Sequence, residues 1–359
     1  MKRVIAAIAV LLLVTLPCMA EGAVETDKLE QAFPYDLYSD GEFTPESADL
    51  KTGLKNLWDT AAAGFRRYIR QSAGAGFLLL ALCAAASLAS GFIKDAGLKL
   101  DLRIVDVALT CMLLTVSFGG AHGVIGECRA AVQRLDGFNT VLIPVFAVSS
   151  AVSGRPVSAV SNAGTAMFFS KILTTLSVSL LIPSIYLFIA AAAAGAVSGN
   201  SLLSRVAQFI KWASGTVFKI FIMAFTGYLT LSGVIAAASD AAAVKTAQAA
   251  ISGAVPVVGS IIAGASDVLL SGAAVLRGAI GIYGFIGACA ICLTPFIKSF
   301  CGLLAFKLLA MAAASFAPKG AAAFLESLAD AYSMALGVLG ACCAAVFISI
   351  TVSMAVTAA

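Results

Sequence analysis

The sequence predicts an all-α, polytopic integral membrane protein: a helical bundle of six to eight spans with a small extracytoplasmic N-terminal helical head. Of its 359 residues, 60% are hydrophobic and only 12% are charged. Soluble domains carry about 25% charged residues, so this chain has too few polar side chains to cover a surface that faces water. Its apolar residues gather in stretches of about 20, the length that crosses a bilayer core of about 30 Å.

Residues 1–20 have the order of a secretory signal peptide. Lys2 and Arg3 precede an apolar run over 4–16, and the small residue Ala20 closes the segment, so we expect cleavage after Ala20. An uncleaved first span is the alternative, but the apolar run is short for one.

Residues 21–72 are expected to form the extracytoplasmic head, because acidic residues outnumber basic ones there. Thr44 can cap a helix whose first position is Pro45. An amphipathic helix then follows, and its apolar stripe is expected either to pack on the membrane domain or to dock a partner. The stripe recurs at spacings of three and four residues: Leu50, Leu54, Leu57, Ala61, Phe65 and Tyr68.

The membrane domain is expected over residues 73–359. The stretch over 165–197 is too long for one straight span and contains Pro183, so it is either one kinked helix or a hairpin of two. The stretch over 140–152 is short for a span. These two stretches leave the count at six to eight. The apolar stretches are 73–93, 104–125, 140–152, 165–197, 215–238, 279–297, 303–316 and 336–356.

Two segments between the spans have unusual patterns. Residues 201–212 place apolar side chains on one face and Arg205 and Lys211 on the other, which predicts a helix lying in the membrane interface. In the segment over 250–266, Pro256 and Gly259 interrupt a short apolar run, as in a re-entrant segment that lines a cavity.

Charges inside membrane segments are costly and often functional, although charges at the ends of spans can extend to water. The isolated charges are Lys171, Asp267, Arg277, Lys298 and Lys307. Glycines spaced along one helix indicate close packing against a neighbour or, as an alternative, a flexible gating helix. The candidate pore, packing or assembly residues are Pro144, Pro256, Gly259, Asp267, Gly281, Gly284, Pro295 and Lys298.

No catalytic motif is found in the sequence. His122 is the single histidine, expected in a loop or at a helix end, so a metalloprotease motif is excluded. A phosphate-binding GxxxxGK[ST] loop is also missing, and Cys289 and Cys292 have no second cysteine pair with the same spacing. We therefore expect neither an enzyme nor a bound cofactor or metal. The net charge of +4 does not favour nucleic acid as a partner.

An ordered series of residues resembles the stage III sporulation protein AE family of endospore-forming bacteria. An earlier segment, Ile143-Pro144-Val145 followed by Ser153-Gly154, is also similar to that family. The series begins with Val255-Pro256-Val257-Val258-Gly259 and continues through Asp267, Gly281, Gly284, Cys292, Pro295, Lys298 and Lys307.

The resemblance implies a location in the mother-cell membrane around the engulfed forespore. It also implies membership of a channel or secretion-like complex with the other stage III A proteins and the stage II protein Q. Two further partners are the lipid bilayer, which is expected around the bundle, and a second copy of the chain, since a homo-oligomer is an open alternative. A secondary transporter is the alternative, with Pro256 at a midplane site and Asp267 and Lys298 as coupling charges.

Overall fold

The computed structural model describes residues 50–95, 102–152, 156–254 and 259–355, which form helices and short connections with no strand among them. Six of the described helical segments are long and apolar enough to cross a membrane. The predicted all-α membrane bundle is confirmed, and the described residues supply six of the six to eight expected spans. The six segments are 51–93, 107–148, 163–198, 201–225, 278–313 and 319–350.

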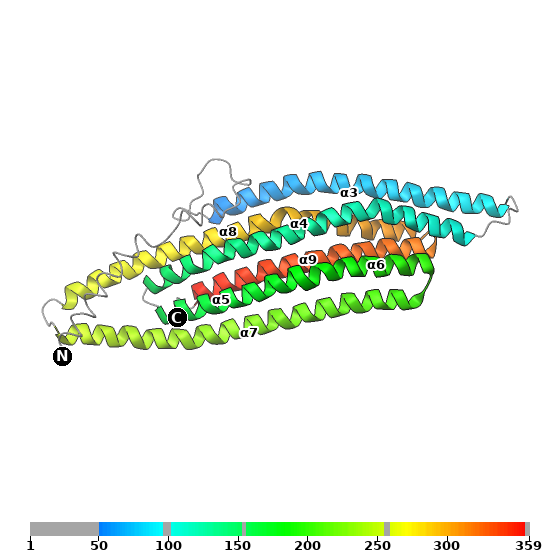
Figure 1. Ribbon diagram of the computed structural model, residues 1–359. Helices are drawn as coiled ribbons and strands as arrows, with labels where there is room; N and C mark the ends of the chain where they lie inside the picture. Colours follow the sequence, from blue (N-terminus) through cyan, green and yellow to red (C-terminus); the bar gives the residue numbers. More distant parts are fainter. Residues whose placement is uncertain (1–49, 96–101, 153–155, 255–258, 356–359) are drawn as a thin grey trace.

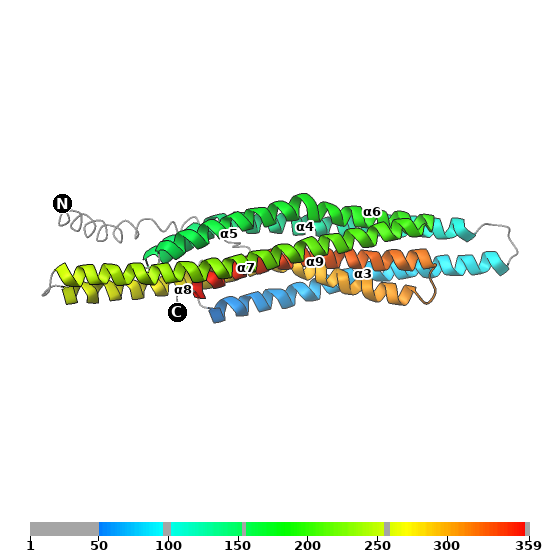
Figure 2. The same cartoon turned by 90° about the horizontal axis from the view of Figure 1, so that it is seen from below.

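The helices run side by side in an elongated bundle (Figures 1 and 2). The last helix, α9, packs against five other helices: α8, α4, α6, α7 and α5. The elements are α3 (Leu50–Asp95), α4 (Leu102–Val152), α5 (Pro156–Leu176), the π-helical turn η2 (Ser177–Leu181), α6 (Ile182–Ser198), α7 (Ser201–Ala254), α8 (Gly259–Ala313) and α9 (Lys319–Ala355).

Two helices each contain two of the stretches that the sequence analysis treated separately. The stretches over 104–125 and 140–152 both belong to α4, and those over 279–297 and 303–316 belong to α8 up to its end at residue 313. The polar residues between the first two stretches do not form a loop, because Glu127 and Asp136 find partners inside the bundle. A helix that satisfies its polar side chains in this way has no reason to end there.

The stretch over 165–197 is one bent helix rather than a hairpin. It passes from α5 through η2 into α6 without leaving helical conformation. Pro183 has no N–H to donate, and its ring would collide with the carbonyl group four residues earlier in a regular α-helix. The π-helical turn directly before Pro183 gives that carbonyl group room, as π turns at helix kinks commonly do.

The signal peptide over 1–20 and most of the head, including Thr44 and Pro45, lie outside the described residues. The rest of the head is part of α3, which runs without interruption past residue 72. Leu57 on α3 is buried, and a Cβ atom at Gly64 would lie 3.5 Å from Ile297 on α8. This part of the predicted amphipathic helix therefore packs on the membrane bundle.

Residues 201–212 form the first turns of the 54-residue helix α7, and their place in the membrane interface stays a prediction. Phe209 and Trp212 are exposed on the outside of the bundle. Lys211 instead reaches Asp330 on α9 at 2.8 Å. The apolar side chains of this segment can face outward because lipid accepts them. Lys211 instead pairs with a carboxylate of the neighbouring helix.

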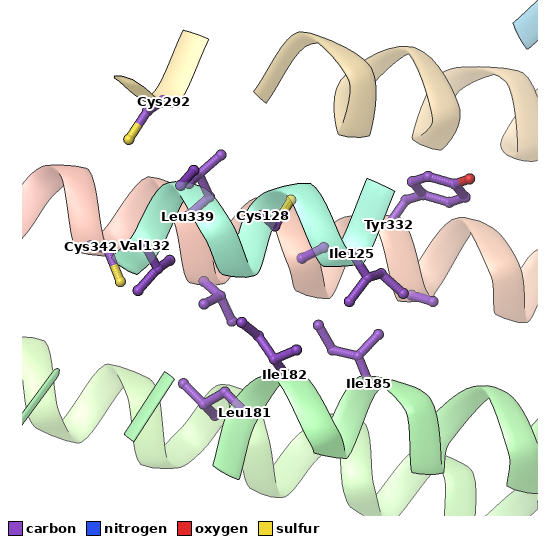
Figure 3. Close-up of a cluster of buried hydrophobic side chains, with 14 of the residues drawn as sticks. Ile125, Cys128, Val132, Leu181, Ile182, Ile185, Cys292, Tyr332, Leu339 and Cys342 are labelled. Atoms are coloured by element: carbon purple, nitrogen blue, oxygen red, sulfur yellow. The ribbon is translucent and has the colours of Figure 1, made fainter. Parts of the chain in front are cut away.

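The core lies where α4, α6, α8 and α9 meet (Figure 3). Side chains of α6 point toward α4 and α9, and Cys292 approaches from α8. The thiols in this core have the size and polarity of small apolar groups and fill space accordingly. The labelled buried residues are Ile125, Cys128, Val132, Leu181, Ile182, Ile185, Cys292, Tyr332, Leu339 and Cys342.

Candidate functional site

A partly exposed ion pair and a cation–π contact join three helices. Lys298 on α8 donates to the carboxylate of Glu127 on α4. The same Nζ atom lies 5.0 Å from the ring centre of Tyr68 on α3, within the range of a cation–π contact. A charge within a membrane protein is costly unless it is paired or hydrated, so each partner stabilises the other here.

The ion pair lies at one end of a cavity of about 300 Å³ between α3, α4, α8 and α9. The cavity is lined by the segments 68–79, 116–127 and 298–309, and by Tyr332. Each segment spans 11 residue steps, which is about 16 Å at the rise of an α-helix. The cavity is therefore a narrow slot along the bundle axis and not a rounded pocket.

The two ends of the slot differ in polarity. Gln71 and Ser72 join Tyr68 and the ion pair at the polar end, whereas Leu79, Val116 and Leu309 occupy the far ends of the three segments. Ser117 is the polar residue in the apolar half, and its hydroxyl group is buried without a hydrogen-bond partner among the described residues. The slot thus has an ionic end and a mainly apolar body.

Three glycines of α4 form part of the slot wall: Gly119, Gly120 and Gly123. All three are exposed, and a Cβ atom built on any of them would meet nothing within 4 Å. The slot is therefore open to the side of the bundle along this strip of backbone.

A second polar cluster joins α4 to α5. Asp136 accepts from Lys171 at 3.0 Å and from the Thr174 hydroxyl at 3.1 Å. Asn139 donates to the Ser170 hydroxyl at 3.1 Å. A cavity of about 20 Å³ between these side chains has room for one water molecule. The cluster closes the helix interface without leaving a charge unpaired.

Three of the charges predicted to be isolated therefore have acidic partners. Lys171 and Lys298 pair as described above, and Lys307 lies 3.2 Å from Glu326 on α9. The side chains of Arg277 and Asp267 lie outside the described part of the chain.

The other candidate residues lie at several levels of the bundle. Pro295 is buried inside α8, three residues before Lys298. Gly284 is also buried on α8, where a Cβ atom would lie 2.8 Å from Leu142 of α4, so the glycine permits close approach of the two helices. Gly281 is buried one turn earlier, and Pro144 lies inside α4 on its exposed side. These four are packing and helix-shape residues, separate from the slot except for the neighbouring Pro295.

Asp267 and Lys298, the coupling charges of the transporter alternative, lie far apart on one helix. Pro256 lies outside the described residues, Gly259 is the first residue of α8, and Asp267 lies within that helix. Asp267 and Lys298 are 31 residues apart on one helix, which is about 46 Å along its axis. The two charges therefore do not share one binding site, as the transporter alternative requires.

Sequence reasoning missed Glu127, Asp136 and Tyr68. The two acids lie between the apolar stretches 104–125 and 140–152 and were not singled out, and Tyr68 was counted only as part of an apolar stripe. Both acids occur between apolar stretches that helical geometry could join, and each has a lysine elsewhere in the spans. The presence of one lysine for each acid was the sequence signal that could have predicted these ion pairs.

His122 also differs from its prediction, since it lies within α4 and not at a helix end. Its Nδ1 atom is 3.1 Å from the hydroxyl oxygen of Tyr186 on α6. Among the described residues, no three His, Cys, Asp or Glu side chains are grouped so that they could hold a metal ion.

The fold and the paired charges define a multi-spanning α-helical membrane protein with a lateral slot in its bundle. The sequence pattern of the family named stage III sporulation protein AE matches residues 50–357, and the chain belongs to this family. The resemblance found in the sequence is thereby confirmed. Membership implies a role in sporulation.

A curated relative is the stage III sporulation protein AE of Bacillus subtilis (strain 168). It is 25% identical over 217 residues, which cover 60% of this chain and 51% of the relative. The matched part thus spans about half the relative's length. No solved structure matches this chain.

Proposed function

We propose that this chain is the membrane subunit of a sporulation-specific transenvelope channel, or secretion-like complex, between the mother cell and the forespore. The observation that supports this most directly is the family match over residues 50–357, which includes all six membrane-competent helices. The chain is required for forespore development after engulfment. It resides in the mother-cell membrane and assembles with the other stage III A proteins and the stage II protein Q.

The chain acts through helix packing and partner contacts and performs no catalysis. Its glycines and alanines bring helices into close contact, as at Gly284, and its paired charges join helices that are distant in sequence. Such a bundle suits a subunit that holds its shape while larger assemblies form around it.

The test is an in-frame deletion in the native organism, with vegetative growth and sporulation scored separately. We expect normal growth, complete engulfment and arrest of the forespore afterwards, and an ectopic copy of the gene should restore spores. Normal spore yield, or arrest before engulfment, would refute the role.

The transporter alternative predicts a different result in the same experiment. A growth defect in vegetative cells that depends on a particular nutrient would favour it. The separation of Asp267 from Lys298 along α8 already argues against its proposed coupling site.

A further inference from the structure

The slot between α3, α4, α8 and α9 has the shape of a single extended hydrocarbon chain. Its volume of about 300 Å³ is spread over about 16 Å, so the slot is long and narrow enough to hold an extended alkyl chain. Ligand cavities of this kind are mostly apolar, with a few polar groups that fix orientation. The apolar body and ionic end of the slot match that description.

The slot is open toward the surroundings of the bundle. Gly119, Gly120 and Gly123 are exposed on its α4 wall and leave open space where side chains would stand. The three glycines lie within the membrane-competent segment 107–148, so lipids are the molecules expected at this opening. A lipid chain can therefore enter sideways, without passing through the helix ends.

The ionic end selects among lipid headgroups. Lys298 and Glu127 neutralise each other, so a ligand with net charge would bring an uncompensated charge into the slot. A headgroup that carries both signs avoids this cost: its phosphate can accept from Lys298 while its ammonium group donates to Glu127. The ammonium group of phosphatidylethanolamine supplies the donor hydrogens that this arrangement needs.

We propose that the slot binds one acyl chain of a phosphatidylethanolamine molecule, with the headgroup at Lys298 and Glu127 and the chain directed toward Leu79 and Leu309. This site is a property of the isolated chain and does not depend on the sporulation role.

The test is photo-crosslinking of the purified full-length chain, reconstituted in bilayers that contain phosphatidylethanolamine with a photoreactive group on its acyl chain. Labelled peptides are mapped by mass spectrometry. We expect labels within the lining segments 68–79, 116–127 and 298–309. Labels confined to the outer surface of the bundle would overturn the proposal.

Two leucine substitutions separate filling of the slot from general damage. The leucine side chain of Gly120→Leu occupies part of the slot, so we expect labelling of the lining segments to fall severalfold below that of the unmodified chain. Gly137→Leu is the matched control, because Gly137 is on the same helix, is equally open and does not line the slot. Equal labelling in both variants would overturn the proposal.

The headgroup is tested with a phosphatidylglycerol probe that carries the same acyl chain. We expect it to label the slot at least about tenfold less. The double variant Glu127→Gln, Lys298→Gln should remove this preference while keeping acyl labelling. Equal labelling by the two probes in the unmodified chain would refute the headgroup assignment.

Discussion

Charged side chains in this protein stabilise the bundle by joining helices that are distant in sequence. The Lys298–Glu127 pair connects α8 to α4, and Lys171–Asp136 connects α5 to α4. The side chain of Lys298 is 22% exposed and that of Glu127 is 45% exposed, so solvent or headgroups screen part of their attraction. The pair therefore contributes less than a fully buried one would.

Glu127→Ala leaves the Lys298 ammonium group without its carboxylate, so we expect a loss of about 1–2 kcal/mol in the free energy of unfolding. Thermal unfolding in one detergent measures the effect. The charge exchange Glu127→Lys, Lys298→Glu should recover part of the loss. Full stability of Glu127→Ala would show that the pair contributes nothing.

Ser117→Ala should stabilise the protein by roughly 1 kcal/mol, because it removes a buried hydroxyl group that has no hydrogen-bond partner among the described residues. Ser299→Ala is the matched control, since the Ser299 hydroxyl is also buried but lies 3.3 Å from the Cys128 sulfur. We expect the control to be destabilised in the same unfolding experiment. Equal losses of stability in both variants would show that the Ser117 hydroxyl group has a hydrogen-bond partner after all.

At the scale of elements, the shape of the connections decides how tightly neighbouring helices pack. α6 ends at Ser198 and is capped by Gly199, whose φ of 66° lies in the left-handed region. The Gly199 N–H donates to the Gly195 carbonyl oxygen at 3.0 Å. Asn200 then accepts from the N–H of Leu202 at 2.9 Å and so caps α7. Two residues thus reverse the chain direction.

Gly199→Ala should lower the free energy of unfolding by about 1 kcal/mol, because an L-residue with a side chain is strained at positive φ. Gly215→Ala on α7 is the opposite case, since its Cβ meets open space inside a helix and should raise stability by up to about 1 kcal/mol. Chemical unfolding of both variants gives the comparison. If both substitutions changed the free energy of unfolding in the same direction, the positive φ at Gly199 would be contradicted.

Gly320→Ala should be destabilising, by about 1–3 kcal/mol, because the new Cβ atom would lie 2.8 Å from the backbone carbonyl oxygen of Ala196. A backbone group cannot rotate away, so α6 and α9 would have to separate. Gly337→Ala on the same helix meets nothing within 4 Å and serves as the control. An unaffected melting temperature for Gly320→Ala would contradict the close approach.

At the scale of the whole molecule, α9 packs against five other helices, whereas α3 packs against α8 and α4. Local opening of a helix requires its contacts to be broken, so we expect backbone amides of α9 to exchange with solvent more slowly than those of α3. Hydrogen exchange with mass spectrometry in one detergent tests this order. Faster exchange in α9 than in α3 would contradict the packing.

Composition and the lengths of apolar stretches predicted the fold class correctly, because the bilayer sets both. Lys298 was found for the same reason, since a charge in an apolar run is conspicuous. Its partners Glu127 and Tyr68 could not be found in this way: the contact depends on how α3 and α4 are positioned against α8, which tertiary packing decides. The long helices were missed because a polar segment between two apolar stretches has the composition of a loop, and the sequence does not show that a neighbouring helix satisfies its polar side chains.

The π-helical turn at 177–181 has a consequence for helical phase. A π turn holds one residue more than an α turn, so it rotates everything that follows by about 100° relative to a regular helix. This offset directs Ile185, Phe188 and Ile189 of α6 into the core. Deleting one residue from the turn would remove the offset and turn these three side chains out of the core, although the composition would hardly change.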